Sequence, residues 1–342
     1  MATGFKQATV NASDVPSTLT NYPAYVDLSR LGITTLAEAQ SVRCYSDSAK
    51  TTELAREIVS VEEMHVLVPS LTSSYVLYVD WDGVSADYAV TDTYGRNAVW
   101  VDYEAVWHFE SDATDSSGTY SAGTVTGATN GAQQIGNGYD FDGTNDKIDL
   151  GRITALESKQ QITHQMWHSS DLTTDRMLWG TPDIGSGNGW EAYYEEATVK
   201  VYFAVRSVAN RFNYPVTNMT ANVPYLWHIV YNGTIAGNIN RFKLYQNATN
   251  MSGSGTYTGT IEGTSQTSTG NFVLGERPGG TFDLNGTFDE MRIRLSVLSD
   301  NWITTEYNNQ SDEAGFWGTW TDVGGGGGGS PTPTLMMMGV GT

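Results

Sequence analysis

Acidic and amide side chains gather in turns of the second half of the sequence, where they could hold a hard cation. Asp142, Asn145 and Asp146 fall within one turn. Calcium takes about six to eight oxygen ligands from carboxylates, amides and carbonyls, so structural calcium is the only cofactor that these residues favour. Their spacing differs from that of an EF-hand, and Asp or Asn in a turn commonly bonds to local backbone N–H groups instead. The sequence leaves both interpretations open.

Aromatic side chains are a second source of chemistry, because exposed rings stack on sugars while nearby polar groups bind sugar hydroxyls. Three tryptophans have apolar neighbours at a period of two residues, which predicts core positions for Trp107, Trp167 and Trp227. Other aromatic residues lie in stretches rich in loop-forming residues. These predict a ligand-binding set that consists of Trp179, Trp190, Tyr193, Tyr194, Arg211 and Tyr214.

Residues suited to catalysis form no established pattern. His164 and His168 are four residues apart in a segment predicted as a strand, where that spacing does not make a metal-binding face. No Ser-His-Asp order is present. A glycoside hydrolase needs two carboxylates roughly 5 to 9.5 Å apart across a cleft. The nearest candidates are Glu191, Glu195 and Glu196. We therefore expect a protein that is not an enzyme.

The composition favours strands as the elements that position these residues. The 342 residues include 37 Gly, 19 Tyr and 10 Trp, and only 16% are charged. The formal charge of −20 disfavours nucleic acid and anionic membranes as partners. Cys44 is the single cysteine, which excludes an intramolecular disulfide, and we interpret it as a buried apolar residue.

Apolar runs divide the chain into three parts. Short alternating runs such as residues 64–68 and 75–79 predict an N-terminal β-sandwich domain over residues 1–100, with one helical turn over 34–39 that a threonine caps. Longer runs predict a second, larger sandwich over 101–322. Six glycines and a Met-rich end form a tail over 323–342. Its Leu335–Met338 patch favours burial against an assembly partner, and a disordered end without a role is the alternative.

Several segments of the larger sandwich resemble one family in the order in which they occur. They are residues 106–110 (VWHFE), 115–118 (DSSG), 138–151 (GYDFDGTNDKIDLG), 227–234 (WHIVYNGT), 286–294 (GTFDEMRIR) and 299–310 (SDNWITTEYNNQ). They resemble the laminin-G-like domains of the concanavalin-A-like lectin/glucanase superfamily. The resemblance implies an all-β chain whose second sandwich is a concanavalin-A-like jelly roll, followed by a short helix ending in EYNNQ.

The same resemblance bears on metal and catalysis. It implies that the strand beginning near Asp289 runs close to the opening segment near Asp115, so these two residues join Asp142, Asn145 and Asp146 as calcium ligands. The glucanase branch carries E-x-D-x-(x)-E on one strand, and this sequence has no such segment. The N-terminal part is similar to a small domain of unknown function found before such sandwiches in surface and phage proteins, through residues 53–59, 68–71 and 89–100.

These observations predict a non-enzymatic structural or adhesion protein on a virion or cell surface, such as a phage decoration or fibre component, with a carbohydrate-binding jelly roll. A glycoside hydrolase and a secreted bacterial adhesin are the alternatives. The N-terminal MATGFKQATV shows no secretory signal or membrane span, which favours a virion surface over Sec export as the route outside the cell. Expected partners are other assembly subunits, contacted through the tail in an oligomer, and cell-surface glycans.

Overall fold

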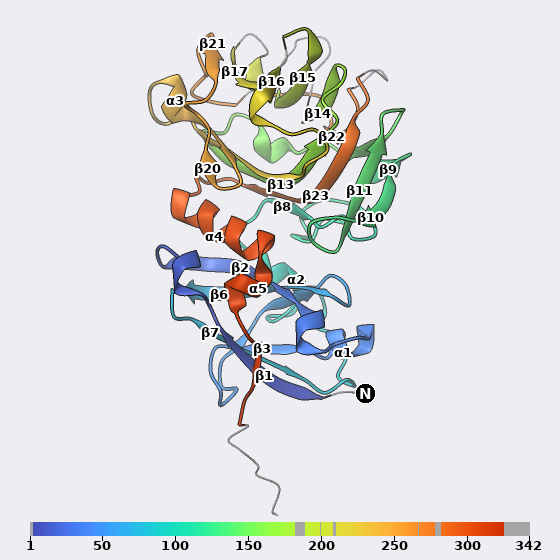
Figure 1. The fold of residues 1–342 in the computed structure, drawn as a ribbon, viewed down its shortest axis with the longest axis vertical. Coiled ribbons are helices and arrows are strands. Elements are labelled where there is room, and N and C mark those ends of the chain that lie inside the picture. Colours follow the sequence, from blue (N-terminus) through green and yellow to red (C-terminus); the bar gives the residue numbers. More distant parts are fainter. Residues whose placement is uncertain are drawn as a thin grey trace, which may run out of the picture.

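The computed structural model describes residues 3–181, 189–198, 200–207, 210–265, 267–277 and 282–324. Two β-sandwiches are stacked along the long axis of the molecule, with helices between them (Figure 1). The predicted all-β class with a concanavalin-A-like jelly roll is confirmed. None of the helices in the described ranges has the length and apolar character needed to cross a membrane. The tail residues 325–342 lie outside the described residues.

The N-terminal sandwich packs a five-stranded sheet against a three-stranded sheet. In β7, Leu77, Val79 and Trp81 are buried and alternate with half-buried residues, which is the pattern of a strand with one face on a core. The first sheet has the order β24-β1-β7-β3-β4, with β1 Gly4–Thr9, β3 Arg43–Tyr45, β4 Glu53–Leu54, β7 Val76–Trp81 and β24 Thr321–Asp322. The second has the order β2-β6-β5, with β2 Leu19–Asp27, β5 Arg56–Ile58 and β6 Glu63–Leu71.

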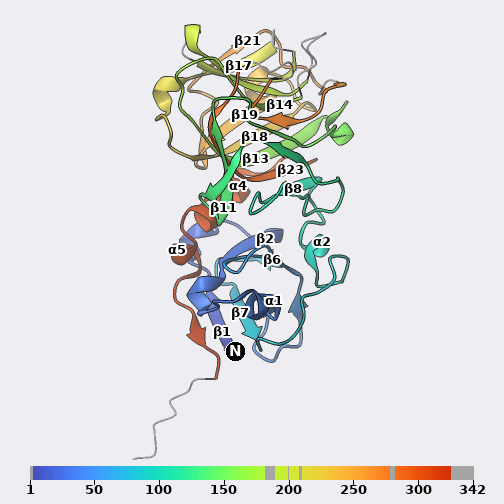
Figure 2. The same ribbon diagram turned by 90° about the vertical axis from the view of Figure 1, so that its right-hand side faces the viewer.

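The end of the described chain returns to the N-terminal sandwich (Figure 2). Helices α4 (Asp300–Ser311) and α5 (Glu313–Trp317) bring Trp302, Phe316 and Trp317 into the core of that sandwich. Strand β24 then pairs with β1. The predicted boundary that assigns residues 101–322 to the second sandwich therefore does not match the packing at the C-terminal end, where α4, α5 and β24 contact the N-terminal sandwich. Apolar periodicity shows that a segment needs burial but not which core buries it.

The jelly roll consists of two eight-stranded sheets. The junction sheet, nearer the N-terminal sandwich, contains β8 Ala105–Trp107, β10 Thr129–Ala132, β11 Asn137–Asp142, β13 Gln161–Ser170, β18 Tyr225–Asn232, β19 Phe242–Gln246, β20 Thr249–Asn250 and β23 Asn285–Arg294. The distal sheet contains β9 Thr124–Thr126, β12 Lys147–Asp149, β14 Arg176–Gly180, β15 Glu191–Glu195, β16 Lys200–Ser207, β17 Asn210–Pro215, β21 Thr256–Thr258 and β22 Val273–Leu274.

The helices are short apart from α4. The predicted turn over 34–39 is α1 (Leu36–Gln40), where Thr35 and Glu38 form a reciprocal capping box. The remaining helices are α2 (Arg96–Val99), α3 (Asn238–Arg241) and the 3-10 turns η1 Ala12–Asp14, η2 Leu28–Leu31, η3 Thr154–Leu156, η4 Glu196–Thr198 and η5 Val216–Asn218. The short helix ending in EYNNQ that the resemblance implied is α4, which lies between the two sandwiches (Figure 1).

The central strand β13 shows how the junction sheet uses its two faces. His164 and His168 contact aromatic rings of the jelly-roll core, so the prediction that they lie on a strand is confirmed. Trp167, between them, donates from its indole Nε1 to Gln310 of α4 on the opposite face. Trp107, Trp167 and Trp227 are buried as predicted, and so is Cys44. One sheet therefore supplies both the apolar core and a polar contact layer toward the N-terminal sandwich.

Candidate functional site

A cluster of charged side chains is buried where the two sandwiches meet. From the N-terminal sandwich, Glu63 and His65 lie two residues apart on β6, and residues at this spacing share a face of a strand. Glu57 of β5 is in register with His65. From the jelly roll come His108, directly after β8, and Glu290 of β23. All five are among the buried residues, so the two domains close the cluster off from water.

Backbone irregularities bring the two jelly-roll residues to the junction. The register between β13 and β23 shifts so that Glu290 and Met291 lie opposite Met166 alone, which is a β-bulge. Glu290 has a φ of 50° and Phe109, next to His108, a φ of 61°. A side chain in this left-handed region costs about 1–3 kcal/mol and persists where the surroundings require it. The bulge directs the Glu290 carboxylate away from the core and toward His108.

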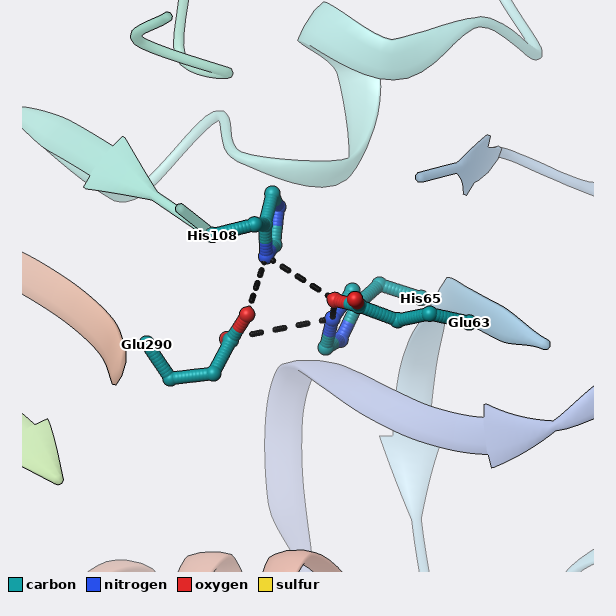
Figure 3. A group of neighbouring side chains, drawn as sticks. All are labelled: Glu63, His65, His108 and Glu290. Carbon is teal, nitrogen blue, oxygen red and sulfur yellow. Dashed lines mark hydrogen bonds and ion pairs between the residues drawn. The ribbon is translucent and has the colours of Figure 1, made fainter. Parts of the chain in front are cut away.

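The four central side chains converge on one point (Figure 3). His65 Nε2 lies 2.9 Å from Glu63 Oε1. His108 Nδ1 lies 3.2 Å from the same Glu63 oxygen and 2.5 Å from Glu290 Oε1. The two imidazole rings stack with centroids 4.7 Å apart. Each carboxylate therefore faces an imidazole that comes from the other domain.

A second layer of polar contacts holds this group. His108 Nε2 lies 3.1 Å from Glu57 Oε2, and the Glu57 carboxylate accepts from Trp100 Nε1 and Ser116 Oγ. Arg292 donates to Glu290 at 2.5 Å and to Glu306 of α4 at 3.1 Å. These contacts fix the orientation of His108 and Glu290 from both domains.

Burial and neighbouring charge shift the pKa values of the cluster in different directions. Burial, reinforced by the Glu290 charge, raises the pKa of Glu63 well above its usual value. Burial also lowers the pKa of His65, and the His108 charge adds to this effect. Although burial opposes both shifts, the charges of Glu290 and Glu57 raise the pKa of His108, and those of His108 and Arg292 lower the pKa of Glu290. These shifts favour the charged forms of His108 and Glu290 and the neutral forms of Glu63 and His65.

A cavity of about 310 Å³ reaches the edge of this cluster. It is lined by both domains, with Glu57, His108, Ser116, Arg56, Arg96 and Asp112 among the lining residues. The cavity therefore borders the cluster at Glu57 and His108.

A second polar cavity, of about 350 Å³, lies on the face of the junction sheet that points away from the jelly-roll core. Thr129, Asp140, Thr287 and Ser169 are successive register partners across β10, β11, β23 and β13. Side chains in register point to the same face. The cavity is completed by Asp142, Asp146, Asn222 and Asn285. We call it the sheet-face cavity.

The predicted calcium ligands make mostly local turn contacts. Asp115 accepts from the backbone N–H groups of Val106, Ser117, Thr119 and Tyr120. Asp142 accepts from Thr144 N, and Asp146 accepts from Asp142 N. Asp289 is buried and accepts from Ile135 N. Asn145 has a φ of 61°, typical of a turn.

The structure does not bring these residues together as one set. Among the described residues, the only group of three or more His, Cys, Asp or Glu side chains with converging donor atoms is Glu63, His65, His108 and Glu290. The predicted assembly of Asp115 and Asp289 with the Asp142 turn is therefore wrong, because each carboxylate bonds to backbone N–H groups near it. Calcium at the Asp142 turn stays a prediction.

The predicted loop aromatics lie on strands or beside them and are buried. Trp179 is on β14, Tyr193 and Tyr194 are on β15, Tyr214 is on β17, and Trp190 directly precedes β15. Trp179 is 2% exposed and Tyr214 is 0% exposed, so neither ring can stack on a sugar. Arg211 is half-buried on β17. The prediction of a loop platform was wrong because the glycines and polar residues beside these rings also suit strand ends.

The comparisons with known proteins found a family match for most of the jelly roll. Residues 142–304 match the model of the concanavalin A-like lectin/glucanases superfamily. No curated protein matches the chain. Among solved structures, domain 4 of AbnA, an extracellular arabinanase from Geobacillus stearothermophilus, in complex with arabinotriose, is 18% identical with a TM-score of 0.45, covering 59% of this chain and 97% of that chain.

Two other matches are larger proteins. The botulinum neurotoxin serotype D binding domain is 14% identical with a TM-score of 0.45, covering 61% of this chain and 51% of that chain. A Trypanosoma rangeli sialidase is 12% identical with a TM-score of 0.45, covering 66% of this chain and 34% of that chain. The resemblance of the N-terminal domain stays a prediction. For residues 142–304, the greater part of the jelly roll, the resemblance to the concanavalin A-like lectin/glucanases superfamily is confirmed.

Proposed function

We propose that this chain is a non-enzymatic carbohydrate-binding protein whose jelly roll binds a glycan in the sheet-face cavity, and that it is displayed on a virion or cell surface. The observation that carries the binding proposal is the composition of this cavity. It gathers carboxylates (Asp140, Asp142), amides (Asn222, Asn285) and a hydroxyl (Thr287) at one place. Such groups bind pairs of sugar hydroxyls with defined direction.

The position of the cavity supports recognition of a rigid ligand. Asp140, Thr287 and Ser169 belong to three hydrogen-bonded strands, and Ser169 Oγ and Thr287 Oγ1 lie 2.9 Å apart. Groups on a sheet keep their spacing better than groups on loops. A volume of about 350 Å³ falls at the small end of the range of ligand pockets. A short segment of a glycan is therefore the expected occupant.

Glycoside hydrolysis is the second candidate, because one cavity carboxyl resembles a general acid. Burial, with the charges of Asp142 and Asp283, raises the pKa of Asp146. Hydrolysis also needs a second carboxylate across the scissile bond, and Asp140 and Asp142 are the other carboxylates that line this cavity. Incubating the chain with a polysaccharide panel and measuring newly formed reducing ends tests this alternative. If the chain hydrolyses a polysaccharide and Asp146→Asn abolishes this activity, the protein is a glycoside hydrolase rather than a protein that only binds glycans.

The binding proposal is tested with a glycan array on the full chain, followed by titration of the best ligand. Asp140→Asn and Asn285→Ala should each weaken binding roughly 10-fold, which corresponds to about 1.4 kcal/mol. The matched control is Asn271→Ala in a separate polar cavity of about 390 Å³ that also contains Asp149. If Asp140→Asn binds normally and Asn271→Ala loses binding, the glycan site is the cavity around Asn271 and not the sheet-face cavity. An array on which no glycan is bound would refute glycan binding.

The display proposal rests on the composition of the tail, through which we expect contact with other assembly subunits. Deleting residues 325–342 should abolish incorporation into the particle while the melting temperature stays unchanged. Incorporation of the shortened chain at normal levels would show that the tail is not the assembly element.

A further inference from the structure

We propose that the junction cluster is a binding site for a first-row divalent transition metal, with zinc as the best fit, which Glu63, His65, His108 and Glu290 hold between the two domains. The donor atoms of these four buried residues all lie within 4.8 Å of one another. Two ligands come from β6 of the N-terminal sandwich and two from the jelly roll (Figure 3). The site is therefore complete only when both domains are in place.

The spacing of the donors suits four-coordinate zinc. Bonds of about 2.0–2.2 Å at tetrahedral angles place neighbouring ligand atoms roughly 3.3–3.6 Å apart. Glu63 Oε1 lies 2.9 Å from His65 Nε2 and 3.2 Å from His108 Nδ1, and the four donor atoms all lie within 4.8 Å of one another. The His108–Glu290 separation of 2.5 Å would open by somewhat under 1 Å. A side-chain adjustment of this size needs no movement of the strands.

An unmatched polar atom points to a missing ligand. Glu63 is 0% exposed, and its Oε2 has no hydrogen-bond partner among the described residues. A buried carboxylate oxygen without a donor is costly. Its partner oxygen Oε1 lies between two imidazoles from different domains, where a cation would bind this oxygen and the lone pair of one nitrogen on each ring. A metal thus accounts for an arrangement that the protein groups alone leave incomplete.

The surrounding contacts are those of a metal-binding histidine. A ligating imidazole commonly donates its other ring N–H to a carboxylate, which fixes the ring and raises its basicity. If His108 binds through Nδ1, its Nε2–H donates to Glu57, which Trp100 and Ser116 hold in turn. Arg292 orients the Glu290 carboxylate in the same way. Both ligands from the jelly roll, His108 and Glu290, are therefore held in place by a second hydrogen-bonded side chain.

The mixture of donors distinguishes this metal from calcium. Calcium binds through oxygen ligands and in larger number, whereas two imidazoles with two carboxylates suit zinc and its neighbours in the first transition row. The junction site and the sheet-face cavity share no lining residue. Metal binding here is consequently independent of the proposed glycan binding.

The test uses the full chain, stripped with EDTA, reconstituted with zinc and dialysed, with the bound metal measured by mass spectrometry. We expect one zinc per chain, and a melting temperature that rises on zinc addition. His65→Gln and His108→Gln should lose the metal, and Glu57→Gln should weaken affinity roughly 10- to 100-fold by removing the outer partner. His168→Gln is the matched control, since His168 is a buried histidine of the jelly-roll core, and it should retain the metal.

A measurement on the unaltered chain covers the case in which a variant fails to fold. Cobalt titrated into the stripped protein should give saturable visible absorption bands of a tetrahedral site, and zinc should displace them. Retention of zinc by His65→Gln and His108→Gln, or a wild-type chain that takes up neither zinc nor cobalt in stoichiometric amount, would overturn the proposal. Asp140→Asn should bind zinc normally, which separates this result from any failure of the glycan proposal.

Discussion

The jelly-roll core and the domain junction bury the same residue type in opposite surroundings. In the core, His164 stacks on Trp179 and Phe272, and within the described part of the chain its ring nitrogens have no hydrogen-bond partner. At the junction, His65 and His108 each contact buried carboxylates. Both regions exclude water, but the core does so with uncharged rings and the junction with ion pairs.

This difference determines which kinds of change destabilise each region. An imidazole in an aromatic core stays uncharged, because burial disfavours the imidazolium form. A buried ion pair contributes little net stability but becomes strongly destabilising when one partner is removed. The junction is therefore sensitive to single charges, and the core is sensitive to shape and to protons. This sensitivity fits a junction that fixes how the two sandwiches dock.

Removing the central cation of the junction should have the largest effect. Arg292→Met leaves the buried carboxylates of Glu290 and Glu306 without their shared donor, so the free energy of unfolding should fall by about 3–5 kcal/mol. Chemical denaturation measures this loss. The control is the neighbouring Met291→Leu in the jelly-roll core, a swap of similar volume that should cost less than about 1.5 kcal/mol. Equal losses in the two variants would abolish the contrast between the regions.

Acid should act on the core through its histidines. Burial lowers the pKa of His164 to about 3 and, outweighing a hydrogen bond from His168 to Thr287, that of His168 to about 4. Below about pH 6.5 the unfolded chain binds protons that the folded core does not bind, so stability falls as the pH falls through the folded values. At pH 5 the loss relative to pH 7 should be roughly 2 kcal/mol for His164.

The variant His164→Phe isolates this contribution. Between pH 7 and pH 5 the variant should lose roughly 2 kcal/mol less stability than the wild-type chain, because it has no imidazole at this position to protonate on unfolding. Urea denaturation at both pH values measures this difference. A difference between the two proteins that does not change with pH would mean that His164 already takes up a proton in the folded core.

Removing a neutral hydrogen bond at the boundary between the two regions should have the smallest effect on stability. Trp167 belongs to the junction sheet and donates to Gln310 of α4 at 2.8 Å. Replacing Gln310 with Met removes one neutral acceptor and should cost about 1 kcal/mol. A double-mutant cycle with Trp167→Phe gives the coupling directly. A coupling as large as the Arg292 effect would show that this neutral contact, rather than the ion pairs, dominates docking.

The failed aromatic prediction shows a limit of periodicity. In β15, four of the five residues Glu191–Glu195 are buried, so the strand is covered on both faces and shows no alternation. With glycines and polar residues beside it, such a segment is indistinguishable from a loop in sequence alone. Trp107 and Trp227 were predictable because their strands carry ordered runs of apolar neighbours.

Residue patterns predicted the all-β class, the capped turn at Thr35 and the burial of the strand tryptophans, because strand alternation and helix capping act between residues close in the chain. The jelly roll was predicted from the resemblance of its ordered segments to a known family. The return of the chain end to the N-terminal core and the meeting of Glu63, His65, His108 and Glu290 are visible only in the folded chain. Those residues come from strands far apart in sequence, and a bulge orients one of them. Their convergence depends on how two complete domains pack, which no local spacing encodes.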